Sequence, residues 1–229
     1  MFGRRKDSPP AHASAVDPLT KARQMSDVVF DTFIKPMKLQ RGLPSPVIAA
    51  MLGTLAGHAA QNAALHGLAT NSPDYSEFTL VTVDGANGDR YYFGDAINRP
   101  VLEWTYSIWA LVGGIVQKMA VPSPDVMEVV DHVASSVGTD AFGVLRDLPE
   151  GAPTVRSLLS LWPAGEALAK DVPHPDYVSV TFGLAYQRLA QTDNLVDPSV
   201  DQTAMARIMI ESTLAASKLI ASPADLGQL

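Results

Sequence analysis

The chain contains no cysteine among its 229 residues. Disulfide bonds, thiolate metal sites and cysteine nucleophiles are therefore excluded as sources of stability or chemistry. Charged residues are also scarce, at 18% of the chain against about 25% in a typical globular protein. This shortage of charge predicts extensive buried helix, an oligomeric surface, or both.

The chain also lacks an apolar run long enough to cross a membrane. The uncharged stretch over residues 42–72 is interrupted by two histidines, a glutamine and an asparagine, so its apolar part falls short of the roughly 20 residues that a span needs. The basic residues 4–6 precede a polar, proline-containing segment where a secretory signal needs an apolar one. We expect a cytoplasmic protein with no membrane partner.

Basic residues are few beyond the start of the chain. Residues 1–41 hold eight of the 17 lysines and arginines, and residues 42–89 hold none, within a net charge of -7. The basic end could dock onto the acidic remainder of the same or another subunit, but a solvated tail and first helix is the simpler interpretation. No surface interleaves basic with aromatic residues, so we expect no nucleic-acid partner.

Several catalytic signatures are missing as well. The chain has no Gly-x-Ser-x-Gly elbow, no phosphate-binding P-loop, no dinucleotide fingerprint and no His-Glu-x-x-His pair. These absences disfavour the common enzyme classes without excluding catalysis by residues scattered along the chain. We assign no catalytic residue, no metal site and no cofactor.

The clearest local signal that is present is a β-hairpin over residues 76–94. β-Branched and aromatic residues alternate over 78–83 and again over 90–93, and Asp84-Gly85 and Asn87-Gly88 supply turn residues between them. A two-stranded hairpin is barely stable alone, so it must lean on helices, recruit a strand or pair with a second chain. Turn geometry also explains the oxygen-bearing side chains of residues 84–89 better than a calcium site does.

The rest of the chain reads as helix. We predict a mainly α fold (α+β by strict count) of about seven helices with one inserted antiparallel hairpin, forming a single domain over residues 17–229 behind a flexible arm at 1–16. The expected helical segments are 18–35, 46–68, 100–119, 124–137, 154–161, 175–191 and 198–220, and residues 163–170 are expected to form a turn or a second short helix. Within the segment 175–191, residues 177–182 also alternate like a strand, so a third strand is the alternative there.

Prolines and glycines indicate where these helices begin, end and pack closely. Four junctions place a capping oxygen before a proline, as expected at a helix N-terminus, namely Asp17-Pro18, Ser45-Pro46, Ser123-Pro124 and Asp197-Pro198. Pro36 is expected to end the first helix. The second helix is predicted to be central and buried, and its small residues Ala49, Gly53 and Gly57 recur every four positions, which allows another helix to approach closely.

Candidate sites are sparse. His58, Asn62 and His66 share one face of the second helix, yet the two histidines are about 12 Å apart along its axis and cannot readily share a metal ion. A polar seam is the simpler interpretation. On the helix from 124, Asp125, Glu128, Asp131 and His132 do not have the spacing of a di-iron motif and are read as a solvated acidic face.

The junction after the hairpin is the best single candidate for binding. Asp95, Asn98 and Arg99 lie close together where a strand leads into a helix, a place that often carries binding groups. A capping Asn98 and an Asp95–Arg99 ion pair would explain the same residues structurally. The candidate ligand site is therefore His58, Asn62, Asp95, Asn98 and Arg99.

Two functions remain open from the sequence. The first is a non-enzymatic cytoplasmic protein that acts through self-association and protein contacts, with a homo-oligomer, specifically a dimer, expected. It depends on low charge density, small-residue helix faces and a hairpin with unpaired edges. The second is a small-molecule-binding protein or enzyme with a polar pocket between helices 46–68 and 100–119.

Overall fold

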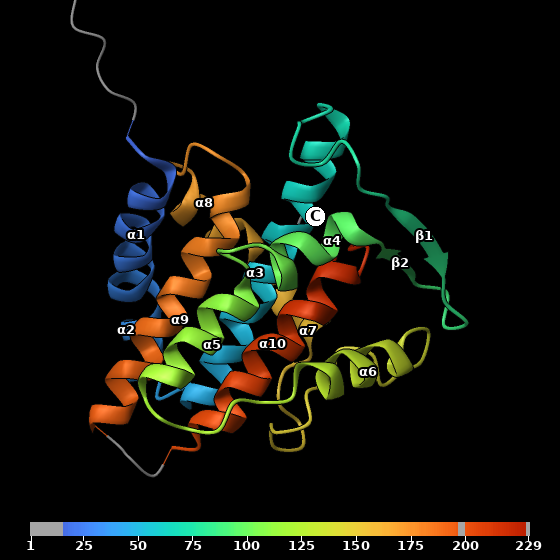
Figure 1. Ribbon diagram of the computed structural model, residues 1–229. Helices are drawn as coiled ribbons and strands as arrows, with labels where there is room; N and C mark the ends of the chain where they lie inside the picture. Colours follow the sequence, from blue (N-terminus) through green and yellow to red (C-terminus); the bar gives the residue numbers. More distant parts are fainter. Residues whose placement is uncertain (1–15, 197–199, 228–229) are drawn as a thin grey trace, which may run out of the picture.

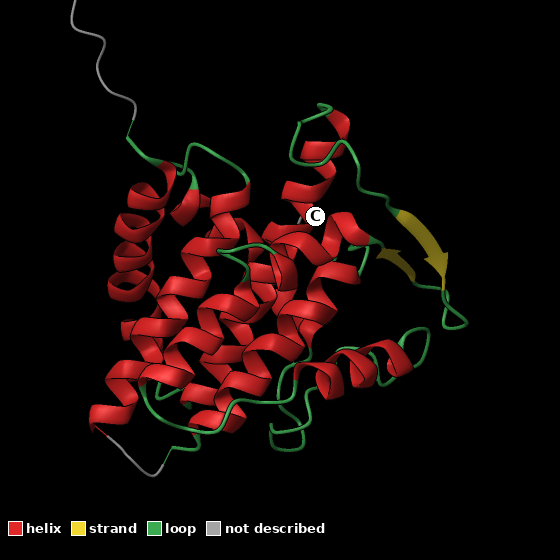
Figure 2. Cartoon of the chain, in the orientation of Figure 1, coloured by secondary structure: helices red, strands yellow, loops and turns green. Residues whose placement is uncertain are grey.

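The computed structural model describes residues 16–196 and 200–227, and side chains at 194–196 are outside that description. The chain is mainly helical with one antiparallel hairpin inserted between α3 and α4, as predicted (Figures 1 and 2). The described part contains seven α-helices of eight or more residues: α1 (Pro18–Val29), α3 (Ser45–Ala69), α5 (Ile108–Lys118), α6 (Val126–Ser136), α8 (Trp162–Ala169), α9 (Asp176–Val196) and α10 (Gln202–Lys218). The arm predicted at 1–16 lies outside the described residues except for Val16.

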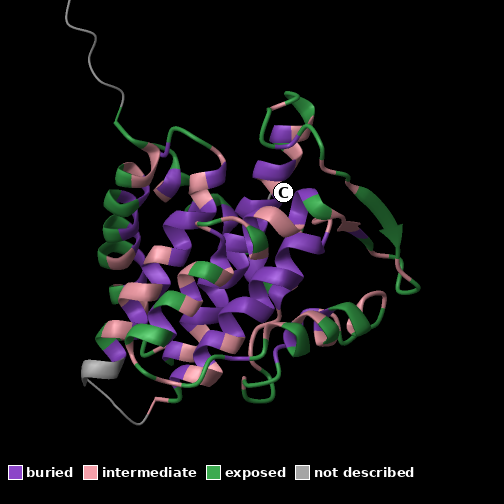
Figure 3. Ribbon diagram, in the orientation of Figure 1, coloured by how far each residue is buried: buried purple, intermediate pink, exposed green. Residues whose placement is uncertain are grey.

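The predicted burial of the second helix is confirmed. α3 runs through the middle of the helical body, and every residue from Ile48 to Gln61 is buried (Figure 3). Its small-residue stripe lies directly against α10. A Cβ atom built on Gly53 would lie 2.5 Å from the carbonyl oxygen of Met209, and one on Gly57 would lie 2.2 Å from that of Thr213. Only glycine permits this backbone approach, so the stripe determines where α10 packs.

The first helix does not end at Pro36, contrary to the prediction. A π-helical turn, η1 (Phe30–Ile34), follows α1, and α2 (Lys35–Leu39) continues beyond the proline. The N–H of Lys35 donates to the carbonyl of Phe30, five residues back. The widened turn leaves room for the proline ring at the start of α2, which is a position where its missing N–H costs little.

The helix predicted over 100–119 is interrupted. Its first residues belong to the π-helical η2 (Arg99–Glu103), which continues the short α4 (Asp95–Asn98), and α5 begins only at Ile108. Trp104 adopts an extended backbone, and the Ser107 hydroxyl caps α5 by accepting from the N–H of Ala110 at 3.2 Å. The periodicity of apolar residues continued across this break and therefore concealed it.

The cap-and-proline prediction is correct at one junction of the three that are described. Asp17 caps α1 by accepting from the N–H of Thr20 at 3.0 Å. Ser45 is the first residue of α3 and not its cap. Ser123 lies three residues before the start of α6, which is capped by Asp125. The fourth junction, at 197–198, lies outside the described residues, and α10 is capped by Asp201.

The other segments follow the prediction more closely. Residues 177–182 belong to α9, so the alternative of a third strand is excluded. Gly138 has a positive φ of 77° immediately after α6 and its C-cap, as expected at a helix end. The segment from 154 forms α7 (Val155–Leu158), the 3-10 turn η3 (Leu159–Leu161) and α8. Among the described residues, no helix combines the length and hydropathy that a membrane span requires.

The hairpin consists of β1 (Val81–Asp84) and β2 (Arg90–Phe93), paired with Val83 opposite Tyr91. It stands at one side of the helical body, beside α6 (Figure 1). The outer edge of β2 is partly closed by the segment after α10, because Ile220 donates its N–H to the carbonyl of Arg90 at 3.0 Å. This contact supplies a partner for one of the two edges that the sequence left unpaired.

Candidate functional site

Two adjoining hollows lie beside the C-terminal half of α3. The larger, of about 350 Å³, is bounded by α3, α8 and the segment that leads into α9. The smaller, of about 290 Å³, continues toward Ser72 and Tyr75 and shares part of the same wall. We call the two together the α3–α8 groove. Residues common to both hollows are Ala63, His66, Pro173 and Pro175.

The groove has an apolar floor and polar walls. The small or apolar residues that line it include Ala59, Ala169, Val172, Val178 and Trp162. Polar side chains come in pairs one helical turn apart: Asn62 and His66 from α3, and Glu166 and Lys170 from α8 and its C-cap. Such a combination of an apolar surface with a few polar groups is typical of small-molecule sites.

One of the five predicted site residues, Asn62, therefore lies at the groove, and the other four lie elsewhere. Asn62 and His66 line the groove, although only Asn62 was among the five residues chosen for binding. His58, on the same face of α3, is buried beneath Trp162, with ring centroids 4.7 Å apart at an angle of 77°. The hollow beside these residues opens toward α8 and not toward the segment 100–119. Asp95, Asn98 and Arg99 do not line it.

His58 is held neutral by its surroundings. Burial lowers the pKa of His58 from 6.5 to about 4 because an imidazolium would be desolvated there. Its Nδ1 atom has no hydrogen-bond partner among the described residues. His58 is therefore a packing residue of the core. Among the described residues, no group of three or more His, Asp or Glu side chains is placed to hold a metal ion.

Arg99 belongs to a cluster at the far end of the groove. Its guanidinium lies 3.2 Å from the buried carboxylate of Asp176 and 3.9 Å from that of Asp74. It also lies over the rings of Tyr75 and Trp104, at 4.9 and 5.2 Å from their centroids. The ion pair with Asp95 that the sequence suggested does not form. Leaving the buried Asp176 carboxylate unpaired would be costly, whereas the exposed Asp95 carboxylate is solvated by water.

Asp176 connects this cluster to the groove. It lines the smaller hollow and accepts a hydrogen bond from the Tyr75 hydroxyl at 2.7 Å. Burial, together with the charge of Asp176, raises the pKa of Tyr75 well above its ordinary value. Asn98 is half-buried and Asp95 is exposed at the first turn of α4, which follows Gly94 with a φ of 127° and has no side-chain cap. Asn98 occupies the N-cap position of η2 but makes no side-chain cap hydrogen bond there, so its expected capping role is wrong.

The residues on α6 are paired in a way that the sequence did not reveal. Glu128 accepts from Arg146 at 2.7 Å, and Nε2 of His132 lies 3.0 Å from the buried carboxylate of Glu211 on α10. Burial raises the pKa of Glu211, while His132 and Arg146 oppose that shift. Asp125, Glu128 and Asp131 are exposed, as predicted for this face, and His132 alone is half-buried, against Glu211.

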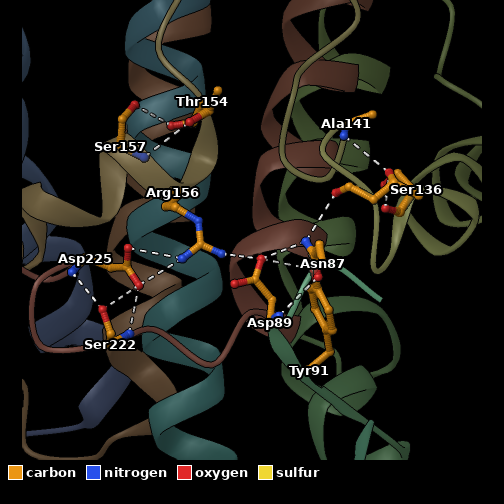
Figure 4. Close-up of polar contacts among 11 residues, drawn as sticks. Asn87, Asp89, Tyr91, Ser136, Ala141, Thr154, Arg156, Ser157, Ser222 and Asp225 are labelled. Atoms are coloured by element: carbon orange, nitrogen blue, oxygen red, sulfur yellow. Dashed lines mark hydrogen bonds and ion pairs between the residues drawn. The ribbon is translucent and has the colours of Figure 1, made fainter. Parts of the chain in front are cut away.

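The turn of the hairpin is held by hydrogen bonds among its own residues, as turn geometry predicts. Asn87 donates from Nδ2 to Asp89 Oδ2 at 2.9 Å and accepts at Oδ1 from the N–H of Asp89 at 3.1 Å (Figure 4). Arg156 then lies between Asp89, at 2.5 Å, and Asp225, at 3.1 Å (Figure 4). The oxygen atoms of the turn are thus used within the protein.

Four groove residues were missed by the sequence analysis: Glu166, Lys170, His174 and Asp176. Each is an ordinary charged or polar residue in a segment without a motif, and the groove is formed by segments about 100 residues apart. Periodicity on α8 could have placed Glu166 and Lys170 on one face, but not against α3. Comparison with protein-family models, with curated proteins and with solved structures gave no match.

Proposed function

We propose that this protein is non-enzymatic and cytoplasmic and acts by self-association, with a second copy pairing along the free edge of β1. The observation that carries the proposal is the exposure of that strand. All four residues of β1 are exposed, and Val81 and Val83 retain 53% and 41% of their accessible surface. Exposed strand edges with apolar side chains are templates for pairing with another chain.

The hydrogen-bond pattern identifies which backbone groups are available. Arg90 uses its carbonyl toward Ile220, so the backbone groups of its neighbour Tyr91 face β1 and pair with Val83. Alternate residues of an antiparallel strand point to opposite edges. Thr82 and Asp84 therefore present their N–H and C=O groups outward, away from β2.

Charge favours one register for two copies. A two-fold axis through Thr82 would place Val81 of one copy beside Val83 of the other and would pair Asp84 with Leu80. This register keeps the two Asp84 carboxylates apart, and Asp84 is already 3.2 Å from Arg90 in its own chain. The valines would then cover one another, which supplies apolar burial at the centre of the contact.

Light scattering after size-exclusion chromatography tests this proposal. We expect the wild type to shift from monomer to dimer as its concentration rises to about 100 µM. Thr82→Pro removes an outward N–H without removing a β1–β2 hydrogen bond, so it should remain monomeric. Thr82→Ala keeps that N–H and should still dimerise. A monomeric wild type over the whole range, or a dimeric Thr82→Pro, would refute the proposal.

Small-molecule binding is a second candidate function, and the α3–α8 groove is the observation that favours it. A hollow of about 350 Å³ with an adjoining one of about 290 Å³ is within the size range of ligand sites. A thermal-shift screen against nucleotides, metal ions and organic acids tests it. A rise in Tm that Ala63→Trp abolishes, by filling the wall shared by the two hollows, would support binding there, and no rise with any ligand would count against it.

A further inference from the structure

We infer that the α3–α8 groove binds a short zwitterionic peptide with apolar side chains, with a dipeptide as the minimal ligand. This inference rests on the second proposed function and adds the chemical class of the ligand. It depends on the arrangement of four polar side chains around one apolar floor: Asn62 and His66 on α3, and Glu166 and Lys170 at α8.

The charges of Glu166 and Lys170 are not used within the protein. Neither side chain makes an ion pair or hydrogen bond with any described residue, although both line the groove. The neighbouring charged groups differ in this respect, since Arg99 and Asp176 pair with each other at 3.2 Å. Glu166 and Lys170 are therefore free to bind an ammonium and a carboxylate of a ligand.

Their spacing suits a dipeptide. Residues four apart on a helix are separated by about 6 Å along its axis. The terminal charges of an extended dipeptide are separated by a similar distance, since each residue spans about 3.5 Å. A single amino acid carries both charges on one carbon atom, so the Glu166 and Lys170 side chains would have to converge on it.

The remaining groups suit the middle of a dipeptide. The Asn62 side chain can donate to and accept from a peptide group at the same time, and it too has no hydrogen-bond partner among the described residues. Ala59, Ala63, Val172 and Trp162 offer an apolar surface to the ligand's side chains. Trp162 also makes binding visible, because a ligand on the floor changes the environment of its indole.

The decisive experiment compares three forms of one probe, leucylphenylalanine, by calorimetry and by tryptophan fluorescence. The unmodified dipeptide carries both charges, its N-acetyl derivative only the carboxylate, and its amide only the ammonium. We expect saturable binding of the unmodified dipeptide and at least about tenfold weaker binding of each blocked form, since each loses one charge-assisted contact. The fluorescence change should be lost in Trp162→Phe.

Two variants assign the charges. Glu166→Gln should weaken binding of the dipeptide and of its amide but leave binding of the N-acetyl derivative unchanged. Lys170→Gln should weaken binding of the dipeptide and of its N-acetyl derivative but leave binding of the amide unchanged. Glu150→Gln and Lys118→Gln remove exposed charges outside the groove and should change none of the three.

The outcomes separate this inference from the proposal on which it rests. No saturation by any form up to about 5 mM, or equal affinity for all three forms, would overturn the zwitterionic peptide as the ligand. If the thermal-shift screen still finds a ligand whose effect Ala63→Trp abolishes, the groove remains a binding site for a different class. If neither experiment finds a ligand, both statements fail.

Discussion

The α3–α10 contact and the hairpin are held in place by opposite means. α3 and α10 meet through glycine and backbone, with the Cβ positions of Gly53 and Gly57 already filled by α10. The hairpin is instead attached through one buried aromatic ring, Tyr91, which packs with Leu159 and Leu219, and through Arg156, which links Asp89 of its turn to Asp225 near the end of the described chain (Figure 4). The first contact depends on volume and is insensitive to salt. The second combines apolar burial with partly exposed ion pairs and leaves one edge of the hairpin open.

Adding a methyl group to the close contact between α3 and α10 should produce the largest loss of stability. Gly57→Ala places a Cβ atom 2.2 Å from the Thr213 carbonyl oxygen, which forces α3 and α10 apart. We expect the free energy of unfolding to fall by about 3 kcal/mol, measured by urea denaturation. Gly113→Ala is the matched control, because nothing lies within 4 Å of its Cβ position on α5, and it should stabilise the protein by up to about 1 kcal/mol. Equal effects of the two substitutions on the free energy of unfolding would show that the glycine stripe does not determine the packing of α10 on α3.

Acid should weaken the helical body through His58. The folded state holds the pKa of His58 at about 4, below its ordinary 6.5, so the unfolded chain binds the proton more readily between those values. Stability is therefore lost as the pH falls through 6.5 toward 4, by about 2 kcal/mol between about pH 7.5 and pH 5. Urea denaturation at the two pH values measures this loss.

A variant isolates that contribution. His58→Leu removes the titrating group and should reduce the pH-dependent loss, whatever its effect at neutral pH. His66→Gln replaces the exposed histidine of the same helix and should keep the loss seen in the wild type. If His58→Leu keeps the full loss, the acid sensitivity belongs to other groups.

Removing the ion pairs that attach the hairpin should have the smallest effect on the free energy of unfolding of the whole protein. It should also have a local effect on hydrogen exchange in the hairpin. Arg156→Met should reduce the free energy of unfolding by only about 1 kcal/mol, because the side chain of Arg156 is 39% exposed and solvent screens its ion pairs. Hydrogen exchange should nevertheless accelerate across residues 84–91 and 219–226 and remain slow in α3. Arg90→Met removes the largely exposed ion pair with Asp84 and should change neither quantity measurably. Uniform acceleration throughout the chain would mean that the hairpin and the helical body unfold as one unit.

A further fall in pH should also loosen the hairpin attachment. Although burial opposes it, hydrogen bonds from Ser222 and Arg156 hold the pKa of Asp225 below its ordinary value. Its contribution to stability is present above the ordinary pKa of an aspartate and is lost as the pH falls through the lowered value. The loss from His58 begins at higher pH, so the helical body should respond to acid before the hairpin does.

Sequence patterns predicted the elements well wherever local chemistry decides the outcome. The alternation and turn residues of 76–94 and the small-residue periodicity of α3 depend on positions close together in the chain, and both are confirmed. Predictions failed at helix ends. Pro36 and the break at Trp104 lie within continuous apolar periodicity, and a π-helical turn or an extended residue alters that periodicity too little to be noticed.

The sequence by itself determined that this chain is mainly helical, has one hairpin and carries a glycine stripe along its central helix. Only the tertiary structure decided that α10 covers the stripe, that Arg99 pairs with Asp176 and not with Asp95, and that Asn62 and His66 share a groove with Glu166 and Lys170. The physical reason is distance along the chain. Helical and strand periodicities arise from neighbouring residues, whereas ion pairs and grooves join segments whose meeting depends on how the entire core packs.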